Sequence, residues 1–358
     1  MNDIKFDLND ILIKPAITTD INSRYSISLP TPLPLITAPM DSVVNLNNHK
    51  KFIDNGIGVA LPRTISYEEY YDRKIYSTKK GQYTNNTYAR KTFISLGFSD
   101  LDRLLSRNPI ILLEIENILI DVANGHMKKI IEYCKKLKKI NKNINIMVGN
   151  IANPETYEYY TKEGCVDYIR VGIGSGGGCL TSKHATIGHP MGSLIHETYQ
   201  IKKKLSTKPY HLPHIVADGG MKDYSDIIKA YALGADYVMI GSLFNKAIES
   251  AGDNYCFKIK INPSLANFLY KKGLPIKKMF RGMSTKEAQK AMGKTSLKTS
   301  EGVVRYRDVE YTLTGWMENF NHYLRSAMSY CNAHDLEQFI GGCDFIRISD
   351  NSYKRFDK

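Results

Sequence analysis

The feature of this sequence that most limits its possible folds is an alternation of short apolar runs with longer amphipathic stretches. Strands that alternate with helices indicate βαβ units and a parallel sheet. The runs are rich in β-branched residues and apolar throughout, which is typical of strands buried on both faces. The eight predicted strands are Leu35–Thr37, Gly58–Leu61, Thr92–Leu96, Ile118–Val122, Ile144–Val148, Tyr168–Val171, His214–Ala217 and Tyr237–Ile240.

Amphipathic segments lie between most of these strands, for example His126–Lys139, Pro154–Glu163, Ser193–Lys204 and Tyr224–Leu233. Eight such units without a second series of strands favour an α/β fold closed into a (β/α)8 TIM barrel. A barrel of this kind takes about 250 residues. The chain has 358 residues, so we predict a single barrel domain, 1–358, with additional arms and loops. Two smaller domains are the alternative.

After the eighth strand the pattern changes. The segment Met279–Tyr311 is polar and rich in Lys, Ser, Thr and Gly, and an excursion of this length is usually a lid or a disordered loop. We therefore predict a mobile flap at about residues 280–311, followed by a C-terminal tail, 312–358. Within the tail, Thr312–Arg325 has helical periodicity and Phe345–Ile348 has the composition of a short strand.

Two boundaries between units have similar sequences. Gly164-Cys165-Val166-Asp167-Tyr168 precedes one predicted strand, and Gly234-Ala235-Asp236-Tyr237 precedes another. Glycine commonly ends a helix in the left-handed conformation, after which the chain can turn into a strand. The similarity is a weak internal sign of a repeated unit.

The formal net charge of +13 suits anionic partners such as nucleic acid, a membrane or phosphorylated ligands. The run Lys135–Lys139 is more simply the solvated face of a helix, and zinc fingers, RNP-type motifs and basic tails are all missing from the sequence. The sequence also has no apolar run long enough to cross a membrane and no signal-peptide pattern at Met1–Lys5. We expect a cytoplasmic protein that binds neither nucleic acid nor membrane.

The six cysteines form no CxxC pair and have no zinc-ligand spacing with histidine. Without a secretory signal, a disulfide framework is not expected. We interpret five of the six as core or incidental thiols and treat Cys179 separately. The cysteines are Cys134, Cys165, Cys179, Cys256, Cys331 and Cys343.

Glycines, carboxylates and amides gather where the predicted strands end. In barrels of this class the active site is built from the loops at the carboxyl ends of the strands. The pairs Gly219-Gly220 and Gly241-Ser242 suit a phosphate group, because glycine lets backbone N–H groups approach an anion; tight turns without a ligand are the alternative. The segments concerned are Ala38–Asp41, Asp121–Gly125, Gly149-Asn150, Gly172–Cys179, Asp218–Gly220 and Gly241-Ser242.

The loop Gly172–Gly178 contains five glycines, and ordering so flexible a segment is entropically costly. An ordered ligand or a cation such as K+ or Na+, held by backbone carbonyls, would explain it. Cys179 ends the loop, and Thr181 follows two residues later. A cysteine near free backbone N–H groups and an anion site is a candidate nucleophile; an inert thiol in a turn is the alternative.

Taken together, these motifs resemble those of the IMP dehydrogenase and GMP reductase family. The resemblance runs from Phe6 to about Ile348, nearly the whole chain, and it implies the same barrel fold. Each motif is weak to moderate alone, but their order and spacing make a chance match improbable. The motifs are Gly172–Thr181, Ala217–Gly220, Val238–Phe244, Arg281–Ser284 and Leu324–Tyr330.

Three features favour the GMP reductase branch. Asn124 stands where dehydrogenases usually have histidine, and Lys298–Gly302 resembles the reductase Ser-Glu-Gly motif and lacks the dehydrogenase Arg-Tyr pair. The short spacing between the second and third strands leaves no room for an inserted regulatory domain. The sequence departs from the family at Gly177, where a phosphate-binding serine is usual, and at Leu180. It also departs at Lys298, which replaces an arginine, while Ala38–Asp41 is closer to the dehydrogenase version.

The resemblance implies an NADPH-dependent reduction of GMP to IMP and ammonia through a covalent bond between Cys179 and the purine, with Thr181 and Glu301 handling the proton. It also implies a bound K+ and a homotetramer. The alternatives are an IMP dehydrogenase that uses NAD, a catalytically impaired nucleotide-binding homologue and a nucleic-acid binder. Nucleotide contacts are implied for Ser175, Asp218, Gly219, Gly220, Gly241, Ser242, Met283, Ser284, Ser300 and Gly302, cofactor contacts for Arg63, Asp121 and Asn124, and cation-binding carbonyls for Gly174, Gly176 and Cys179.

Overall fold

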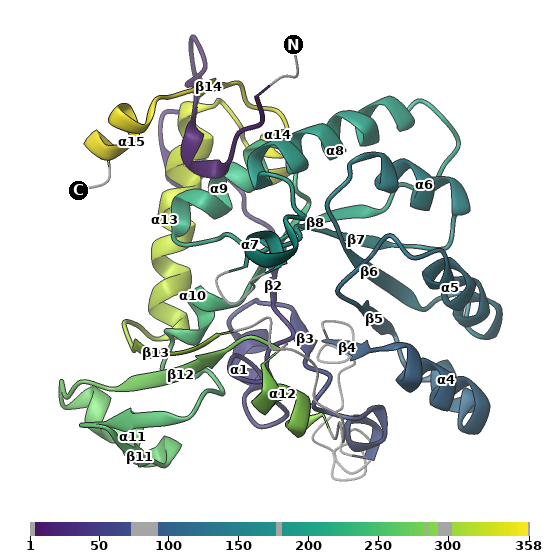
Figure 1. The fold of residues 1–358 in the computed structure, drawn as a ribbon. Helices are drawn as coiled ribbons and strands as arrows, with labels where there is room; N and C mark the ends of the chain where they lie inside the picture. The colour runs from purple at the N-terminus through teal and green to yellow at the C-terminus, as the bar shows by residue number, and fades with distance from the viewer. Residues whose placement is uncertain (1–3, 73–91, 177–180, 284, 293–302, 357–358) are drawn as a thin grey trace.

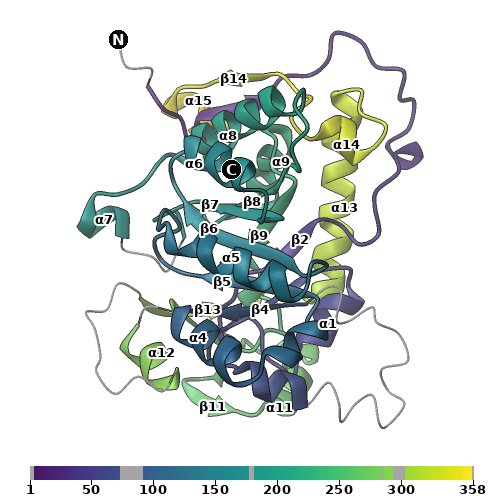
Figure 2. The ribbon, with the colours of Figure 1, turned by 90° about the vertical axis from the view of Figure 1, so that its right-hand side faces the viewer.

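The computed structural model describes residues 4–72, 92–176, 181–283, 285–292 and 303–356. Its centre is an eight-stranded parallel sheet in the order β2-β9-β8-β7-β6-β5-β4-β3. An isolated parallel bridge between Ile36 and Gly58 joins the two outer strands and completes the barrel (Figures 1 and 2). The strands are β2 (Leu35–Thr37), β3 (Val59–Leu61), β4 (Thr92–Leu96), β5 (Asn117–Asp121), β6 (Asn145–Ile151), β7 (Tyr168–Val171), β8 (His214–Asp218) and β9 (Tyr237–Ile240). All eight predicted strands and the barrel are therefore confirmed.

Helices cover the outside of the sheet. The four predicted helices are present, and the helix expected in the tail is longer than predicted, because it continues to Tyr330. Residues 67–72 are also helical. The main helices are α1 (His49–Asp54), α4 (Phe98–Arg107), α5 (Lys129–Ile140), α6 (Glu155–Glu163), α8 (Met191–Leu205), α9 (Tyr224–Ala232), α10 (Ser242–Asn245) and α13 (Leu313–Tyr330). The smaller elements are η1 (Leu8–Asp10), η2 (Arg24–Ser26), η3 (Pro109–Leu113), α7 (Thr181–Ala185), α14 (Leu336–Phe339) and α15 (Asp350–Phe356).

The strands are apolar throughout because both of their faces are buried. Side chains such as Phe93 and Leu119 fill the barrel interior, whereas their neighbours Ile94 and Ile118 pack outward beneath the helices. Tyr168 packs against the interior cluster together with Tyr237. The interior is thus a packed core, as barrels of this size require.

A second sheet was not predicted from the sequence. It is antiparallel, has the order β11-β10-β12-β13 and lies below the barrel in Figures 1 and 2. Its elements are β10 (Asn254–Cys256), β11 (Ile259–Ile261), α11 (Pro263–Lys271), β12 (Lys277–Arg281) and β13 (Val304–Asp308). The sequence of β13, Val-Arg-Tyr-Arg-Asp, is polar and mostly exposed. Because it lacks an apolar run, the sequence pattern predicted a loop here and not a strand.

The segment predicted as a lid or disordered loop is partly ordered. It begins in β12 and ends after β13. These two strands are antiparallel, and their paired residues run from Lys277 opposite Asp308 to Arg281 opposite Val304. Helix α12 (Lys286–Ala291) lies between them in the chain. A simple disordered loop is therefore wrong for its described part, because the paired strands satisfy each other's backbone groups.

The two similar boundaries noted in the sequence have the same structural role. Asp167 Oδ2 accepts a hydrogen bond from Ile146 N (2.7 Å), and Asp236 Oδ2 accepts one from Ile215 N (2.6 Å). Each carboxylate also forms an ion pair with a lysine. Asp167 pairs with Lys138 of α5 (2.8 Å), and Asp236 pairs with Lys202 of α8 (2.6 Å). The repeat suggested by sequence is thus a repeated strand-joining contact.

The two ends of the described chain meet beside the barrel. Strand β1 (Ile11–Ile13) pairs antiparallel with β14 (Phe345–Arg347), the short strand predicted in the tail. Figure 1 shows β14 and α15 in the upper part of the molecule, near the purple N-terminal segment. No helix in the described part of the chain is long and apolar enough to span a membrane.

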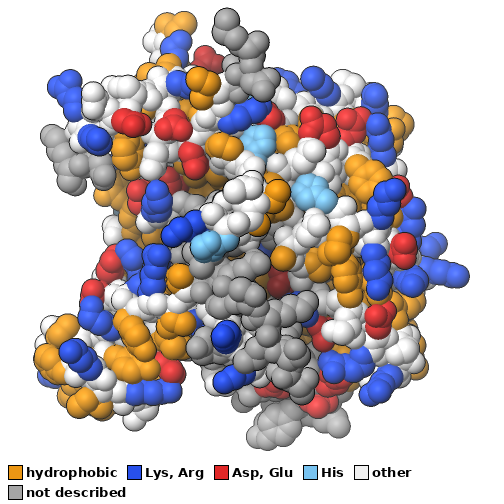
Figure 3. Space-filling model, in the orientation of Figure 1, with side chains coloured by type: hydrophobic (Ala, Val, Ile, Leu, Met, Phe, Trp, Pro, Cys, Tyr) orange, Lys and Arg blue, Asp and Glu red, His pale blue; other side chains and the backbone are white. Residues whose placement is uncertain are grey.

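Charge on the visible face in Figure 3 is mixed. Lys and Arg side chains alternate with Asp and Glu over the described surface rather than gathering into one basic patch. On this face, such a distribution gives little of the focused potential that a nucleic-acid groove needs.

Candidate functional site

A cavity of about 480 Å³ lies at the carboxyl ends of the barrel strands. Its wall is built from the loops after these strands and from the flap, which contributes Phe280, Met283 and Gln289. Such a position is where barrel enzymes bind their substrates. The predicted site residues that line it are Arg63, Asp121, Gly174, Gly176, Thr181, Asp218, Gly219, Gly220, Gly241, Ser242 and Met283.

A buried ion cluster forms the floor of this cavity. Arg170 projects from β7 and is 6% exposed. Its Nη1 donates to Asp121 Oδ1 (2.7 Å), while Nε and Nη2 donate to Asp218 Oδ2 (3.2 and 2.7 Å). Burial alone would lower the pKa of Arg170, but Asp218 and Asp121 outweigh it and raise that pKa above its usual value. The guanidinium therefore stays charged and partly neutralises both carboxylates.

Asp218 is held on one oxygen. Besides Arg170, the amide of Asn150 donates to Oδ2 (2.7 Å), and the same amide donates to Gly172 O (2.8 Å). Oδ1 receives no hydrogen bond from the described residues. Because Asp218 lines the cavity, this oxygen is available to accept a hydrogen bond from a ligand hydroxyl.

The glycine-rich loop after β7 packs tightly against the turn after β8. At Gly172, where φ is +128°, a Cβ would lie 2.2 Å from Asp218 O, so only glycine fits. At Gly219 a Cβ would lie 2.7 Å from Ser175 Oγ. Ser175 does not line the cavity. Its Oγ donates to Asp218 O (3.2 Å) and so holds the turn after β8, which does line it.

The candidate phosphate-binding turns adjoin each other in the cavity wall. Gly220 has a φ of +83°, and Gly241 directly precedes α10. Ser242 is the first residue of α10, and its Oγ reaches Met221 O at 3.5 Å, the limit of a hydrogen bond. Gly219, Gly220, Gly241 and Ser242 therefore line the same cavity, and turns of this composition can offer backbone N–H groups and a hydroxyl to an anion.

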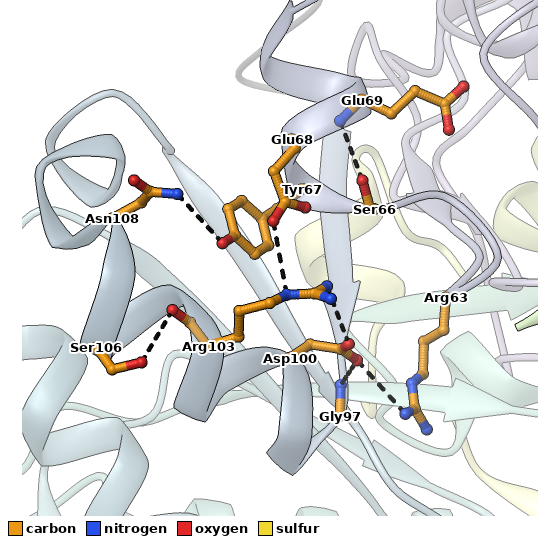
Figure 4. Close-up of polar contacts among 10 residues, drawn as sticks. All are labelled: Arg63, Ser66, Tyr67, Glu68, Glu69, Gly97, Asp100, Arg103, Ser106 and Asn108. Atoms are coloured by element: carbon orange, nitrogen blue, oxygen red, sulfur yellow. Dashed lines mark hydrogen bonds and ion pairs between the residues drawn. The ribbon is translucent and has the colours of Figure 1, made fainter. Parts of the chain in front are cut away.

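Arg63 reaches the cavity from the loop after β3, and Figure 4 shows its surroundings. Its Nη2 contacts Asp100 Oδ2 (3.4 Å), and this oxygen also accepts the Gly97 N–H (2.9 Å). On the other side, Asp100 Oδ1 lies 3.6 Å from Arg103, which also pairs with Glu68 at 3.5 Å. Nε of Arg63 is buried and has no hydrogen-bond partner among the described residues.

Asn124, unlike the other two predicted cofactor residues, does not line the cavity. It is exposed, and its Oδ1 accepts the backbone N–H of His126 (3.0 Å). His126 accepts the Ala152 N–H at Nε2 (3.1 Å), so Nδ1 carries the proton toward Thr156 (2.9 Å). Burial lowers the pKa of His126, which favours this neutral form. The loop that holds Asn124 is thus fastened to the start of α6.

Several predicted residues lie outside the described part of the chain. In sequence, Cys179 falls between Gly176 and Thr181, both of which line the cavity. Predictions that concern the other residues in this group stay predictions. They are Gly177, Leu180, Ser284, Lys298, Ser300, Glu301 and Gly302.

Sequence reasoning missed Arg170. The available signal was a charged residue within the otherwise apolar strand Tyr168–Val171. Asn150 was noticed only as part of a strand end, and Gln289 was not noticed. No group of three or more His, Cys, Asp or Glu side chains is placed to hold a metal in the parts of the chain described above.

Comparison with known proteins gives a consistent result. The family model of the IMP dehydrogenase / GMP reductase domain matches residues 6–356. A GMP reductase of Caenorhabditis elegans is 29% identical over 98% of this chain and 94% of its own length. GMP reductase 2 of Bos taurus is 28% identical and a GMP reductase of Buchnera aphidicola is 27% identical. Each match covers 97% of this chain and 95% of the relative's own length.

Proposed function

Because the chain belongs to the IMP dehydrogenase / GMP reductase family, we propose that it is a GMP reductase, an oxidoreductase that converts GMP to IMP and ammonia with NADPH. The observation that carries this proposal is the match to relatives named GMP reductase over 97–98% of the chain. The cavity at the strand ends supports it, since its wall offers separate groups for a sugar, a phosphate and a second ligand.

The nucleotide would be held by the loops after β8 and β9. Asp218 lines the cavity, and Arg170 holds its Oδ2. Its Oδ1, which receives no hydrogen bond from the described residues, suits the ribose hydroxyls. The turns at Gly219-Gly220 and Gly241-Ser242 offer backbone donors for the phosphate. Ser175 would support this site, and Met283 would lie against the base together with Ser284, Ser300 and Gly302.

The chemistry would begin at Cys179. Its thiolate adds to C2 of the purine, and the C2–amine bond breaks with transfer of a proton, so that ammonia leaves and a thioimidate remains. Thr181 and Glu301 would transfer that proton, because an acid or base must lie within hydrogen-bond reach of the departing group. When hydride reaches C2, the C–S bond breaks, and IMP and the thiolate are released.

NADPH, when bound, supplies the hydride. The residues present fit a dinucleotide: Arg63 has a buried Nε without a partner among the described residues, and Asp121 lines the same cavity. Arg63 would contact a cofactor phosphate, while Asp121 and the Asn124 loop would border the region of hydride transfer. With these contacts the cofactor would lie on the side of β3 and β5, and the nucleotide on the side of β8 and β9.

We also propose a bound K+ and a tetramer, as the resemblance in sequence implies. The carbonyls of Gly174, Gly176 and Cys179 would hold K+, since oxygen donors of this type are suited to that ion. The enzyme would be a cytoplasmic homotetramer. Activity that is higher in K+ than in choline buffers, and a tetramer by light scattering, are the expected observations.

One pair of assays tests the function directly. The protein is incubated with GMP and NADPH, and separately with IMP and NAD, and the nicotinamide absorbance is followed together with released ammonia. We expect NADPH oxidation matched by ammonia in the first mixture. Signal only in the second would make the protein a dehydrogenase, and GMP binding without either signal would make it a binding protein.

A further inference from the structure

A single arginine connects the two halves of the cavity. Asp121 ends β5, on the cofactor side of the proposed site, and Asp218 ends β8, on the nucleotide side. Arg170 on β7 contacts both carboxylates at 2.7 Å. The Arg170 side chain is 7% exposed, whereas those of Asp121 and Asp218 are 22% and 13% exposed, so the guanidinium is the shielded partner of both pairs. Coulombic interactions at this depth are much stronger than at a surface.

The reach of Arg170 depends on a glycine in the strand between. Asp121, Gly149 and Arg170 are partners in register across β5, β6 and β7. A Cβ at Gly149 would lie 2.6 Å from Arg170 Cβ. The missing side chain therefore leaves the space through which the guanidinium crosses β6 to reach Asp121.

The hydrogen bonds leave one oxygen of each carboxylate available. Arg170 holds Oδ1 of Asp121 and Oδ2 of Asp218. The other oxygen of each receives no donor among the described residues, and both aspartates line the cavity. Because guanidinium is a rigid planar fork, turning it toward one carboxylate changes its fit to the other.

We propose that Arg170 is a positioning residue that couples nucleotide binding at Asp218 to cofactor binding at Asp121. The proposal rests on the proposed function for the identity of the two ligands. A nucleotide that fixes Asp218 also fixes the guanidinium, which in turn presents Asp121 in its binding orientation to the cofactor. Coupling of this kind is reciprocal, so each ligand tightens the binding of the other by the same factor.

Calorimetry with GMP and the oxidised cofactor NADP+, which cannot reduce GMP, measures the coupling. In the wild type we expect NADP+ to tighten GMP binding by about tenfold. Arg170→Lys keeps the charge but loses the fork, and we expect less than about a twofold effect. In steady-state assays the same variant should raise KM for both GMP and NADPH.

A matched control is Arg103→Lys. Arg103 also lies between two carboxylates, Asp100 and Glu68, but it is far more exposed and does not line the cavity (Figure 4). We expect this variant to keep the wild-type coupling and the wild-type KM for GMP. If coupling is lost in Arg170→Lys but not in Arg103→Lys, the loss is due to the place of Arg170 between the two sites and not to the change from arginine to lysine.

A second variant keeps the test decisive if Arg170→Lys does not fold. Asp121→Asn leaves the Arg170–Asp218 pair intact, and it should bind GMP alone normally but show no enhancement by NADP+. The proposal is overturned if Arg170→Lys retains tenfold coupling, if it raises only one KM, or if wild type shows no coupling. A wild type that couples the two ligands without reducing GMP would reject the proposed function and keep the role of Arg170.

Discussion

Gly172 illustrates how a single residue determines the packing of the site. Its positive φ and the 2.2 Å that would separate a Cβ from Asp218 O both exclude a side chain. Gly164 has a φ of +66° but open space around it, since a Cβ there would meet no atom within 4 Å. An alanine at Gly164 would therefore suffer backbone strain only, whereas an alanine at Gly172 would suffer both backbone strain and steric overlap.

We expect Gly172→Ala to destabilise the protein by about 3 kcal/mol, since backbone strain and overpacking add. Gly164→Ala should cost only about 1 kcal/mol, because backbone strain acts alone. Denaturant unfolding of both variants measures the difference. Equal losses of stability would contradict the steric argument at Gly172.

Cys179 is the residue on which the proposed chemistry depends. Cys179→Ala should abolish turnover, because no other group would form the bond to C2, while GMP still binds. Single-turnover assays with NADPH and calorimetry with GMP test both parts. Full activity in this variant would rule out the covalent mechanism.

Glu301 has the separate role of moving the proton. Glu301→Gln keeps the size of the side chain but removes its acid–base function, so ammonia release should stop. The ammonia produced in a GMP and NADPH mixture measures this step. An unchanged rate would assign the proton transfer to another residue.

At the scale of elements, β12 contains an unusual buried lysine. Lys278 is 1% exposed and donates to Ser250 O (2.6 Å). Burial lowers its pKa from 10.5 to about 8; Glu249 and Asp253 oppose this shift, and Lys51 adds to it. Burying the charged amine therefore costs stability at neutral pH.

Between pH 8 and 10.5 the unfolded chain binds more protons at Lys278 than the folded one, so this residue makes the protein more stable as pH rises. Relative to Lys278→Met, the wild type should gain up to about 3 kcal/mol between pH 7 and pH 10.5. Unfolding curves of both proteins across this range give the difference.

Lys277→Met is the matched control for this titration. Lys277 is the exposed neighbour of Lys278, paired with Asp308 at the surface. The difference in free energy of unfolding between Lys277→Met and the wild type should change little over the same pH range. A similar rise in both variants would show that Lys278 is not the group responsible.

At the scale of the whole molecule, the N- and C-terminal segments stabilise each other. β14 pairs with β1, Ile348 N donates to Asp10 O (2.8 Å), and Lys14 N donates to Asp344 O (2.8 Å). Phe345 packs against Phe6, with ring centroids 5.2 Å apart. The tail thus covers an N-terminal core residue.

Deleting residues 342–358 should lower Tm by about 3–6 °C, because Phe6 and the edge of β1 lose their cover. Deleting only 350–358 keeps β14 and should lower Tm less. Calorimetric melting of the two truncated proteins compares them. Equal melting temperatures would show that β14 contributes nothing.

The sequence predicted the barrel well because its strands are buried on both faces, so each is a continuous apolar run that needs no partner to be recognised. It predicted the ring of glycines and Asp218 for a similar reason, since strand ends can be located once the strands are known. β13 was missed because an exposed antiparallel strand has no such run. The cofactor role of Asn124 stays a prediction; the structure shows its side chain accepting the backbone N–H of His126, a contact that the sequence did not predict.

By itself, then, the sequence determined the eight strands, the edge of the barrel that holds the site, and Cys179 as the candidate nucleophile. Only the tertiary structure decided how the charges at that edge are joined. Asp121, Gly149 and Arg170 are separated along the chain and come into one row through strand register. Register depends on the packing of the whole barrel, so no local pattern in the sequence could reveal that Arg170 holds both carboxylates.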